Sequence, residues 1–196
     1  MRAFLTTADP LAFGVDFSDR SVKLIALRRH GARLRLATWG QAPIPAGLIE
    51  KGEIRDGAAL AAVVRTLLKS DLKGEQLRGN HVILALPEQH SFVRVVELPP
   101  VAAEQVSEAV RWEAEANIPL PLDEMELDGE AVTPPGEGAR REALIAATPT
   151  KIVAEYLVAL RGAGLAPLVL EVESMALARA VVPGFTTAEA LLIMDL

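Results

Sequence analysis

Alternating hydrophobic and polar residues predict a β-hairpin near the start of the chain. Phe13, Val15 and Phe17 alternate with small or polar residues, which is the pattern of a strand with one buried face. A second apolar run at residues 22–27 follows after a few polar residues. The two runs predict a hairpin, with Asp16 at its turn.

The next segments predict a sheet that combines antiparallel and parallel strands. Residues 33–39 alternate again after a turn at His30–Gly31, as a third strand of a meander would. Asp56 then suits the N-cap of a helix, and residues 81–86 form a continuous apolar run typical of a strand covered on both faces. The helix has one apolar stripe, formed by Leu60, Val63, Val64, Leu67 and Leu68. This β-β-β-α-β order predicts a mixed sheet.

From Pro87 onward the pattern predicts a second, inserted unit of β-α-β-β-α order. Its first helix must end near Asn117, because two prolines follow closely and cannot continue it. The expected elements are a strand at 92–98, a helix from about 103 to 117, strands at 125–132 and 143–147, and a helix that stops near 162–164. A further strand at 168–170 and a helix at 173–180 return to the first unit.

These boundaries predict four parts. They are an N-terminal tail (1–11), a discontinuous first lobe (12–87 and 167–187), an inserted subdomain (88–166) and the start of a truncated second lobe (188–196). The chain ends in an apolar strand without a turn, which indicates a fragment. Asp195 lies near the end of that strand as Asp16 does in the first, which hints at a duplicated, two-lobed protein.

Composition excludes several classes of site. The chain has 196 residues, 51% of hydrophobic types, with a net charge of −6 and no cysteine, so disulfide frameworks and thiolate zinc sites are excluded. Its three histidines are scattered, and its acidic balance with only two Trp and one Tyr does not suit nucleic acid. No apolar run reaches the ~20 residues of a membrane span, and none near the start suits a secretory signal. We therefore expect a cytoplasmic protein.

The polar turn of the hairpin has the residue types of a phosphate site. It offers backbone N–H groups, the hydroxyls of Ser18 and Ser21, and Lys23 close to Asp16. Such a loop can hold phosphates and a hydrated Mg²⁺ without a GK[ST] motif. The alternative interpretation is a surface hairpin with a solvated Asp-Arg pair.

Three sets of segments also carry a resemblance to a known family. They are Gly14–Ser18 with Ser21–Leu24, Ala85–Pro87 with Glu97–Pro99, and Arg111–Glu115 with Ile118–Pro121 and Glu126–Asp128. These segments resemble the PilM family of type IV pilus assembly, in the actin-like ATPase superfamily. The likeness continues through residues 171–179 but covers only the first half of the family's length. It implies an α/β fold: an actin-like (ribonuclease H-like) first lobe, with a mixed sheet flanked by helices and a small inserted α+β subdomain.

The resemblance implies that ATP and Mg²⁺ bind at the hairpin. Asp16 would orient Mg²⁺ through water, the turn from Phe17 to Ser21 would lie against the β- and γ-phosphates, and Lys23 would offset their charge. Ser18 departs from the family, which usually has a glycine there, so a side chain lies where the backbone should approach phosphate. Asp195 resembles the start of the family's second phosphate loop.

Two glutamates are the candidates for catalysis. Glu171 and Glu173 lie where the family's interlobe helix begins, and could position a water for hydrolysis. The alternative for each is an exposed or helix-capping glutamate. We expect ATP binding with weak or no ATPase activity.

The resemblance implies a partner as well, namely a short N-terminal cytoplasmic peptide of PilN, an inner-membrane protein. The peptide would lie in the groove between the inserted subdomain and the first lobe. Arg111 and Trp112 are candidate groove residues, since Trp112 falls beside the apolar row of its helix; the alternative for Trp112 is core packing. This places the protein at the cytoplasmic face of the inner membrane without inserting into it, and leaves the oligomeric state open.

Two other functions remain as alternatives. A cell-division protein resembling FtsA would share the lobe and the insertion but would need a C-terminal amphipathic membrane anchor. A sugar or acetate kinase of the same superfold would need a catalytic acid and a substrate pocket, and the sequence shows no paired carboxylates to form one.

Overall fold

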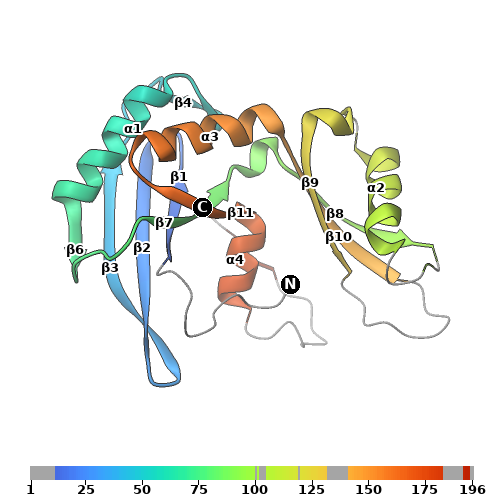
Figure 1. Ribbon diagram of the computed structural model, residues 1–196, viewed down its shortest axis with the longest axis horizontal. Helices are drawn as coiled ribbons and strands as arrows, with labels where there is room; N and C mark the ends of the chain where they lie inside the picture. Colours follow the sequence, from blue (N-terminus) through green and yellow to red (C-terminus); the bar gives the residue numbers. More distant parts are fainter. Residues whose placement is uncertain are drawn as a thin grey trace.

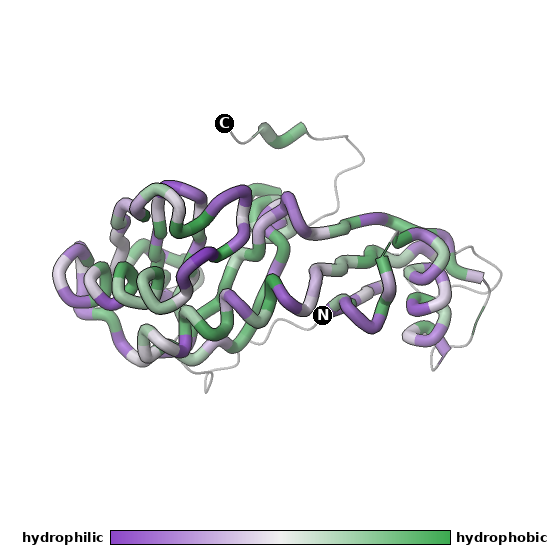
Figure 2. Tube along the Cα trace, turned by 90° about the horizontal axis from the view of Figure 1, so that it is seen from above, coloured by the Kyte–Doolittle hydropathy of each residue, from purple (hydrophilic) through white to green (hydrophobic). Residues whose placement is uncertain are grey.

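The computed structural model describes residues 12–99, 101, 105–118, 120–131, 141–182 and 192–194. The described elements form two units, each with its own hydrophobic core (Figure 1). The larger unit is built on a six-stranded sheet and the smaller on a three-stranded sheet. The smaller unit lies at one end of the elongated molecule, as the view from above in Figure 2 shows.

The six-stranded sheet has the order β11-β7-β1-β2-β3-β6. Its strands are β1 (Ala12–Phe17), β2 (Ser21–His30), β3 (Arg33–Pro43), β6 (Leu72–Gly74), β7 (His81–Leu86) and β11 (Ala166–Val172). Strand β1 pairs antiparallel with β2 and parallel with β7. The meander followed by a parallel strand, predicted from the hydrophobic pattern, is therefore confirmed. The small β4 (Ile49–Glu50) and β5 (Glu53–Ile54) form a separate hairpin.

One face of this sheet is covered by helices α1 (Gly57–Thr66) and α3 (Thr150–Gly162). The helix α1 begins where Asp56 caps it, with Oδ1 accepting from the backbone N–H of Ala59 at 2.9 Å. Of the predicted apolar stripe, Leu60, Val64 and Leu67 are buried and the other two side chains pack against the same core. Leu67 lies one residue beyond α1, in the short π-helix Leu67–Asp71.

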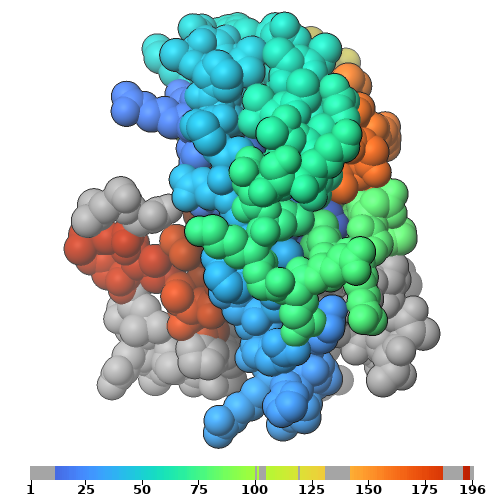
Figure 3. Space-filling view, turned by 90° about the vertical axis from the view of Figure 1, so that its left-hand side faces the viewer, coloured from blue at the N-terminus to red at the C-terminus, as the bar shows by residue number. Residues whose placement is uncertain are grey.

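The other face of the sheet is largely open. Strand β7 was expected to be covered on both faces, and this holds only in part, since α4 packs against the strand but Ile83 is still 38% exposed. Helix α4 (Glu173–Val181) packs chiefly against β7 and β11, and within the described part of the chain no helix covers β2 and β3 on this side. The long β2–β3 hairpin projects from the body of the molecule (Figure 3). Its open face leaves an apolar patch of Ile25, Leu27, Leu36 and Trp39.

The smaller unit is a three-stranded antiparallel sheet with the order β8-β10-β9 and one helix, α2. Its elements are β8 (Phe92–Leu98), α2 (Val106–Asn117), β9 (Met125–Ala131) and β10 (Arg141–Pro149), close to their predicted positions. Helix α2 approaches β9 very closely at Gly129, where a Cβ atom would lie 2.4 Å from Cγ1 of Val110. A side chain at this position would push the helix off the sheet.

The structure corrects the expected end of the inserted subdomain. The boundary at residue 166 would include α3, but the buried side chains of α3, such as Ile152, Tyr156 and Leu160, belong to the larger core. The chain returns to the larger unit at Thr148, whose Oγ1 lies 2.9 Å from Oγ of Ser91 at the point of exit. Helix α3 joins the larger core because its apolar stripe packs against α1. The insertion therefore spans residues 88–149.

The expected last strand and the N-terminal tail fall almost entirely outside the described residues. Only residues 192–194 of that strand are described, and they have no regular secondary structure.

We expect the 196-residue chain to self-associate through the patch on the open face. Replacing Ile25 and Leu36 with threonine removes apolar surface while keeping β propensity, and should shift the mass measured by light scattering toward the monomer. The matched control is Val158→Thr, because Val158 is 64% exposed on α3, away from the patch. A wild-type chain that stays monomeric at every concentration would contradict this prediction.

Candidate functional site

The hairpin β1–β2 places an acid and a base together on the open face. Asp16 and Lys23 are register partners, and Lys23 Nζ lies 3.5 Å from Asp16 Oδ2. Both side chains border a groove of about 950 Å³, which Glu171 of β11 also lines. Because Val15 and Phe17 point into the core, the alternation of β1 directs Asp16 into this groove.

The turn between the two strands is closed by the Ser18 side chain. Ser18 N–H donates to Ser21 O at 2.9 Å, while the N–H groups of Ser21 and Arg20 donate to Ser18 Oγ at 3.1 and 3.4 Å. The Oγ atoms of Ser18 and Ser21 lie 3.2 Å apart. Two backbone N–H groups of this turn are therefore engaged by the Ser18 hydroxyl.

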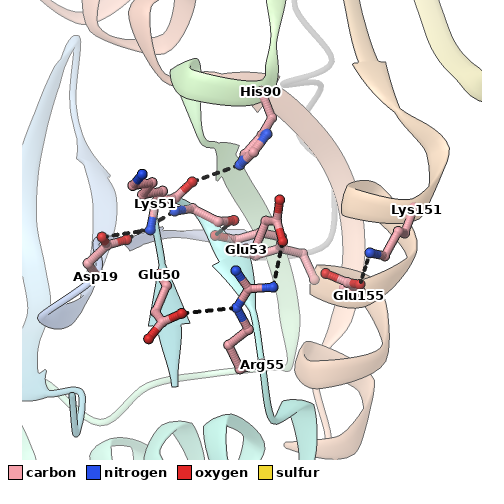
Figure 4. Close-up of polar contacts among 10 residues, drawn as sticks. Asp19, Glu50, Lys51, Glu53, Arg55, His90, Lys151 and Glu155 are labelled. Carbon is pink, nitrogen blue, oxygen red and sulfur yellow. Dashed lines mark hydrogen bonds and ion pairs between the residues drawn. The ribbon is translucent and has the colours of Figure 1, made fainter. Parts of the chain in front are cut away.

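Asp19, at the tip of the same turn, does not form the solvated pair with arginine that the alternative interpretation expected. Its carboxylate accepts the backbone N–H groups of Lys51 and Gly52, at 2.8 and 3.0 Å (Figure 4). Lys51 and Gly52 form the turn between β4 and β5, with φ angles of 52° and 79°. Successive left-handed residues direct both N–H groups to one side, which suits a single anion.

The carbonyls of the same turn accept hydrogen bonds from two distant residues. His90 Nε2 lies 2.7 Å from Lys51 O and must donate there, because a carbonyl oxygen only accepts (Figure 4). Tyr156 OH donates to Gly52 O at 3.0 Å. Two constraints require glycine at position 52. Its φ angle is positive, and a Cβ atom there would lie 2.9 Å from Cβ of Pro87.

Tyr156 also touches the hairpin directly. Its ring is fully buried and meets the ring of Phe17 edge to face, with centroids 5.6 Å apart. Burial raises the pKa of the Tyr156 hydroxyl well above its usual range, and the nearby carboxylates of Asp19 and Asp16 raise the pKa further.

The two candidate catalytic glutamates have different environments. Glu171 accepts from Arg179, at 2.6 Å from Nη2 and 3.0 Å from Nε. Glu173 is the half-buried first residue of α4, whose Ser174 N–H is capped by Glu88 at 3.3 Å. Water positioning by Glu171 or Glu173 stays a prediction.

A second groove, of about 240 Å³, lies between the insertion and the larger unit. One wall is formed by β9 and β10, and the other by β11, α3 and α4. Its lining combines apolar side chains with charged ones: Leu86, Leu127, Ala146, Val153, Val169, Leu170, Val172 and Met175, with Glu126, Asp128, Glu171 and Arg179. Within the described part of the chain, β9 and β11 are each the last strand of their sheets, and both contribute residues to this groove.

Arg111 and Trp112 lie elsewhere. Both are exposed on α2, and neither lines the groove. The core-packing alternative for Trp112 is wrong, since 59% of its surface is exposed. Asp195, the candidate from the second phosphate loop, lies outside the described residues.

Comparison with known proteins identifies the family. The family model of the type IV pilus assembly protein PilM matches residues 14–190. The chain belongs to the PilM family. A solved structure titled as the PilM-PilN type IV pilus biogenesis complex contains a chain with 34% identity and a TM-score of 0.76. That match covers 86% of this chain and 49% of the other.

A more distant likeness supports the fold alone. The cytoplasmic domain of EpsL, an inner-membrane component of the type II secretion system of Vibrio cholerae, matches with 13% identity and a TM-score of 0.52. The match covers 81% of this chain and 56% of that domain. The chain therefore spans about half the length of the solved structures that it matches. The expected actin-like α/β fold and the PilM resemblance are both confirmed, and the family match favours PilM over the FtsA-like and kinase-type alternatives.

None of the described helices is long and apolar enough to cross a membrane.

We expect Tyr156→Phe to lower the free energy of unfolding by about 1–3 kcal/mol, because the carbonyl of Gly52 loses its donor in a buried site. The cost should shrink above about pH 10, the pKa of an unfolded tyrosine. Above that pH the unfolded state loses the tyrosine proton that the native state keeps, so this contribution lowers the stability of the wild type and not of the variant. Denaturant titrations across this pH range measure the difference.

The chain has one tyrosine, so tyrosinate absorbance reports on Tyr156 alone. The native protein should give no tyrosinate signal near pH 10, whereas the denatured protein should titrate there. A native titration at the ordinary pKa would show that the hydroxyl is not held by Gly52.

Proposed function

We propose that the full-length protein is an actin-like, nucleotide-binding scaffold of type IV pilus assembly. In this proposal ATP and Mg²⁺ bind at the β1–β2 hairpin, and the groove between β9 and β11 holds the N-terminal cytoplasmic peptide of a PilN-type inner-membrane protein. The observation that carries the proposal is the Asp16–Lys23 pair at the border of a large open groove, in a chain of the PilM family. The protein would then lie at the cytoplasmic face of the inner membrane through its partner.

The residues present fit a magnesium nucleotide. A Mg²⁺ ion that keeps its waters needs only one or two protein carboxylates, and Asp16 supplies one that faces the groove. Lys23 supplies a positive charge beside it for a phosphate group. Bound Mg²⁺ would neutralise phosphate charge, while Asp16 orients its water shell. Weak or absent turnover is part of the proposal, since Glu171 is engaged by Arg179.

Ser18 controls how readily the turn accepts phosphate. Its hydroxyl holds the N–H groups of Ser21 and Arg20, so a phosphate must displace it to reach these donors. The two states therefore compete for the same hydrogen bonds. The hydroxyl lowers nucleotide affinity without blocking the site, because a serine side chain can rotate away.

Asp16→Ala in the full-length protein should abolish Mg²⁺-dependent ATP binding in calorimetry, because the only carboxylate of the hairpin that faces the groove is lost. Ser18→Gly should bind ATP more tightly, by about tenfold, because phosphate then has no competitor for the two N–H groups. Asp123→Ala, which removes an exposed carboxylate from the insertion, is the matched control. Undiminished affinity in Asp16→Ala would refute the site.

The second groove suits an extended peptide with aliphatic anchors. Its lining is mostly apolar, and β9 and β11, each the last strand of its sheet among the described residues, contribute to its walls, which suits β-strand addition. The solved PilM-PilN complex is of a chain similar to this one, which supports PilN as the partner. The distant position of Arg111 and Trp112 makes them candidates for a different contact.

Ala146→Arg should abolish capture of the partner peptide in a pull-down, because a long side chain fills a groove of about 240 Å³. The control is Val95→Arg, since Val95 is 51% exposed on the same sheet but does not line the groove. Replacing residues 92–147 with a short glycine linker should have the same effect. The ends can be joined because Ser91 and Thr148 are hydrogen-bonded. Recruitment that survives both changes would place the partner elsewhere.

A further inference from the structure

The turn between β4 and β5 is joined on one side to the hairpin, and on the other side to His90 at the start of the insertion and to Tyr156 of α3. On the hairpin side, Asp19 accepts both N–H groups of Lys51 and Gly52. On the other side, the two carbonyls of the same residues accept from His90 and Tyr156. All four backbone polar groups of this two-residue turn are therefore used in contacts with separate segments. Figure 4 shows the two that Lys51 makes, with Asp19 and His90.

Of the two residues that bond the carbonyls, His90 lies where the chain leaves the larger unit, and Tyr156 lies in α3, the first helix after the chain has returned. His90 belongs to the short 3-10 helix Glu88–His90, between β7 and β8, where the chain leaves the larger unit. Gly52 packs against Pro87 in the same connection, so closely that a Cβ atom on residue 52 would clash with the Pro87 side chain. A shift of the β4–β5 turn must therefore move this exit or break its contacts.

The segment that follows the insertion is also joined to the β4–β5 turn, through Tyr156. Tyr156 lies in α3, the helix that follows β10, and its ring contacts Phe17 next to the hairpin turn. Ser91 binds both Pro87 O and Thr148 Oγ1, at 2.9 Å each, and so holds the exit and the return side by side. This junction joins the insertion to the larger unit, and the groove between β9 and β11 is lined by residues of both.

The geometry of the β4–β5 turn leaves it little freedom to absorb a movement of Asp19. Lys51 is the only non-glycine residue with a positive φ in the described part of the chain, a conformation that persists only where surrounding contacts hold it. Asp19 lies within the turn that a phosphate would rearrange, one residue after Ser18. Displacement of the Ser18 hydroxyl by phosphate changes the hydrogen bonds on both sides of Asp19.

We propose that the β4–β5 turn, held by Asp19 and His90, couples the nucleotide site to the peptide groove, so that each ligand changes the affinity for the other. Asp19 acts here as a positioning residue rather than a ligand of Mg²⁺ or phosphate, because its carboxylate is engaged by two backbone N–H groups. The coupling is reciprocal by thermodynamic necessity. This inference rests on the proposed function and adds to it the element that connects its two sites.

The test uses the full-length protein, a non-hydrolysable ATP analogue with Mg²⁺, and a synthetic peptide of the N-terminal cytoplasmic residues of the PilN-type partner. Calorimetry should show that the nucleotide changes the dissociation constant of the peptide by ~5-fold or more in the wild type. In Asp19→Ala and His90→Ala that ratio should fall to about 1, while each ligand alone still binds. A purely structural role would weaken the separate affinities instead of removing their coupling.

Two further variants make the result specific. His90→Gln keeps a side-chain N–H donor for the carbonyl of Lys51 and should retain the coupling. Glu53→Gln alters the same hairpin at a side chain that binds only Arg55 among the described contacts, and should leave the coupling unchanged. Coupling that persists in both Asp19→Ala and His90→Ala would overturn the proposal.

A second measurement needs no ligand and so separates this inference from the proposed function. In His90→Ala, amide hydrogen exchange should quicken at Lys51 and Gly52, and also at Ser21 in the hairpin turn, because loss of one bond loosens the whole connection. Faster exchange confined to the neighbourhood of residue 90 would refute the mechanical link, whatever the ligands do. Failure of the wild type to bind either ligand would instead refute the proposed function.

Discussion

The candidate site depends on the alternation of core-facing and outward-facing side chains along strand β1. Phe13, Val15 and Phe17 fill the core beneath α1 and α3, so the residues between them must face the other side of the sheet. Asp16 therefore enters the open groove, and the antiparallel register places Lys23 beside it. A one-residue slip in this pairing would bury the carboxylate and expose the aromatic rings. The packing of the core thus determines where the Asp16 and Lys23 side chains lie.

Features that depend on neighbouring residues were predictable from the sequence. The meander, the Asp56 cap and the ends of α2 follow from local periodicity, caps and prolines, and the structure has them at nearly the predicted residues. Two expectations failed, one of them only in part, because they concern what a segment packs against. The apolar stripe of α3 identifies a helix but not its core, and the run in β7 does not tell whether a second layer covers Ile83. Both depend on contacts distant in sequence.

The same distinction holds within the site. Asp16 and Lys23 could be paired from sequence because a short hairpin brings them together. The bonds from Asp19 to Lys51 and Gly52 could not, since they join residues more than thirty positions apart. The sequence carries one indication of this turn, a Lys-Gly pair between two isoleucine-containing segments, which favours a hairpin. Nothing in it identifies Asp19, His90 or Tyr156 as the partners.

Asp16 and Asp19, three residues apart, have different proposed roles because their side chains point in different directions. The Asp16 side chain points into the groove and pairs with the exposed side chain of Lys23, whereas the Asp19 side chain accepts the backbone N–H groups of Lys51 and Gly52. Charge-assisted bonds to a rigid turn restrain Asp19 more than an exposed lysine restrains Asp16. A ligand could therefore replace Lys23 as the partner of Asp16 at a small cost in free energy. Asp19 could move only together with Lys51 and Gly52, to which it is hydrogen-bonded. In the proposed coupling, Asp19, which does not touch the ligand, is therefore the residue that transmits ligand binding to the β4–β5 turn.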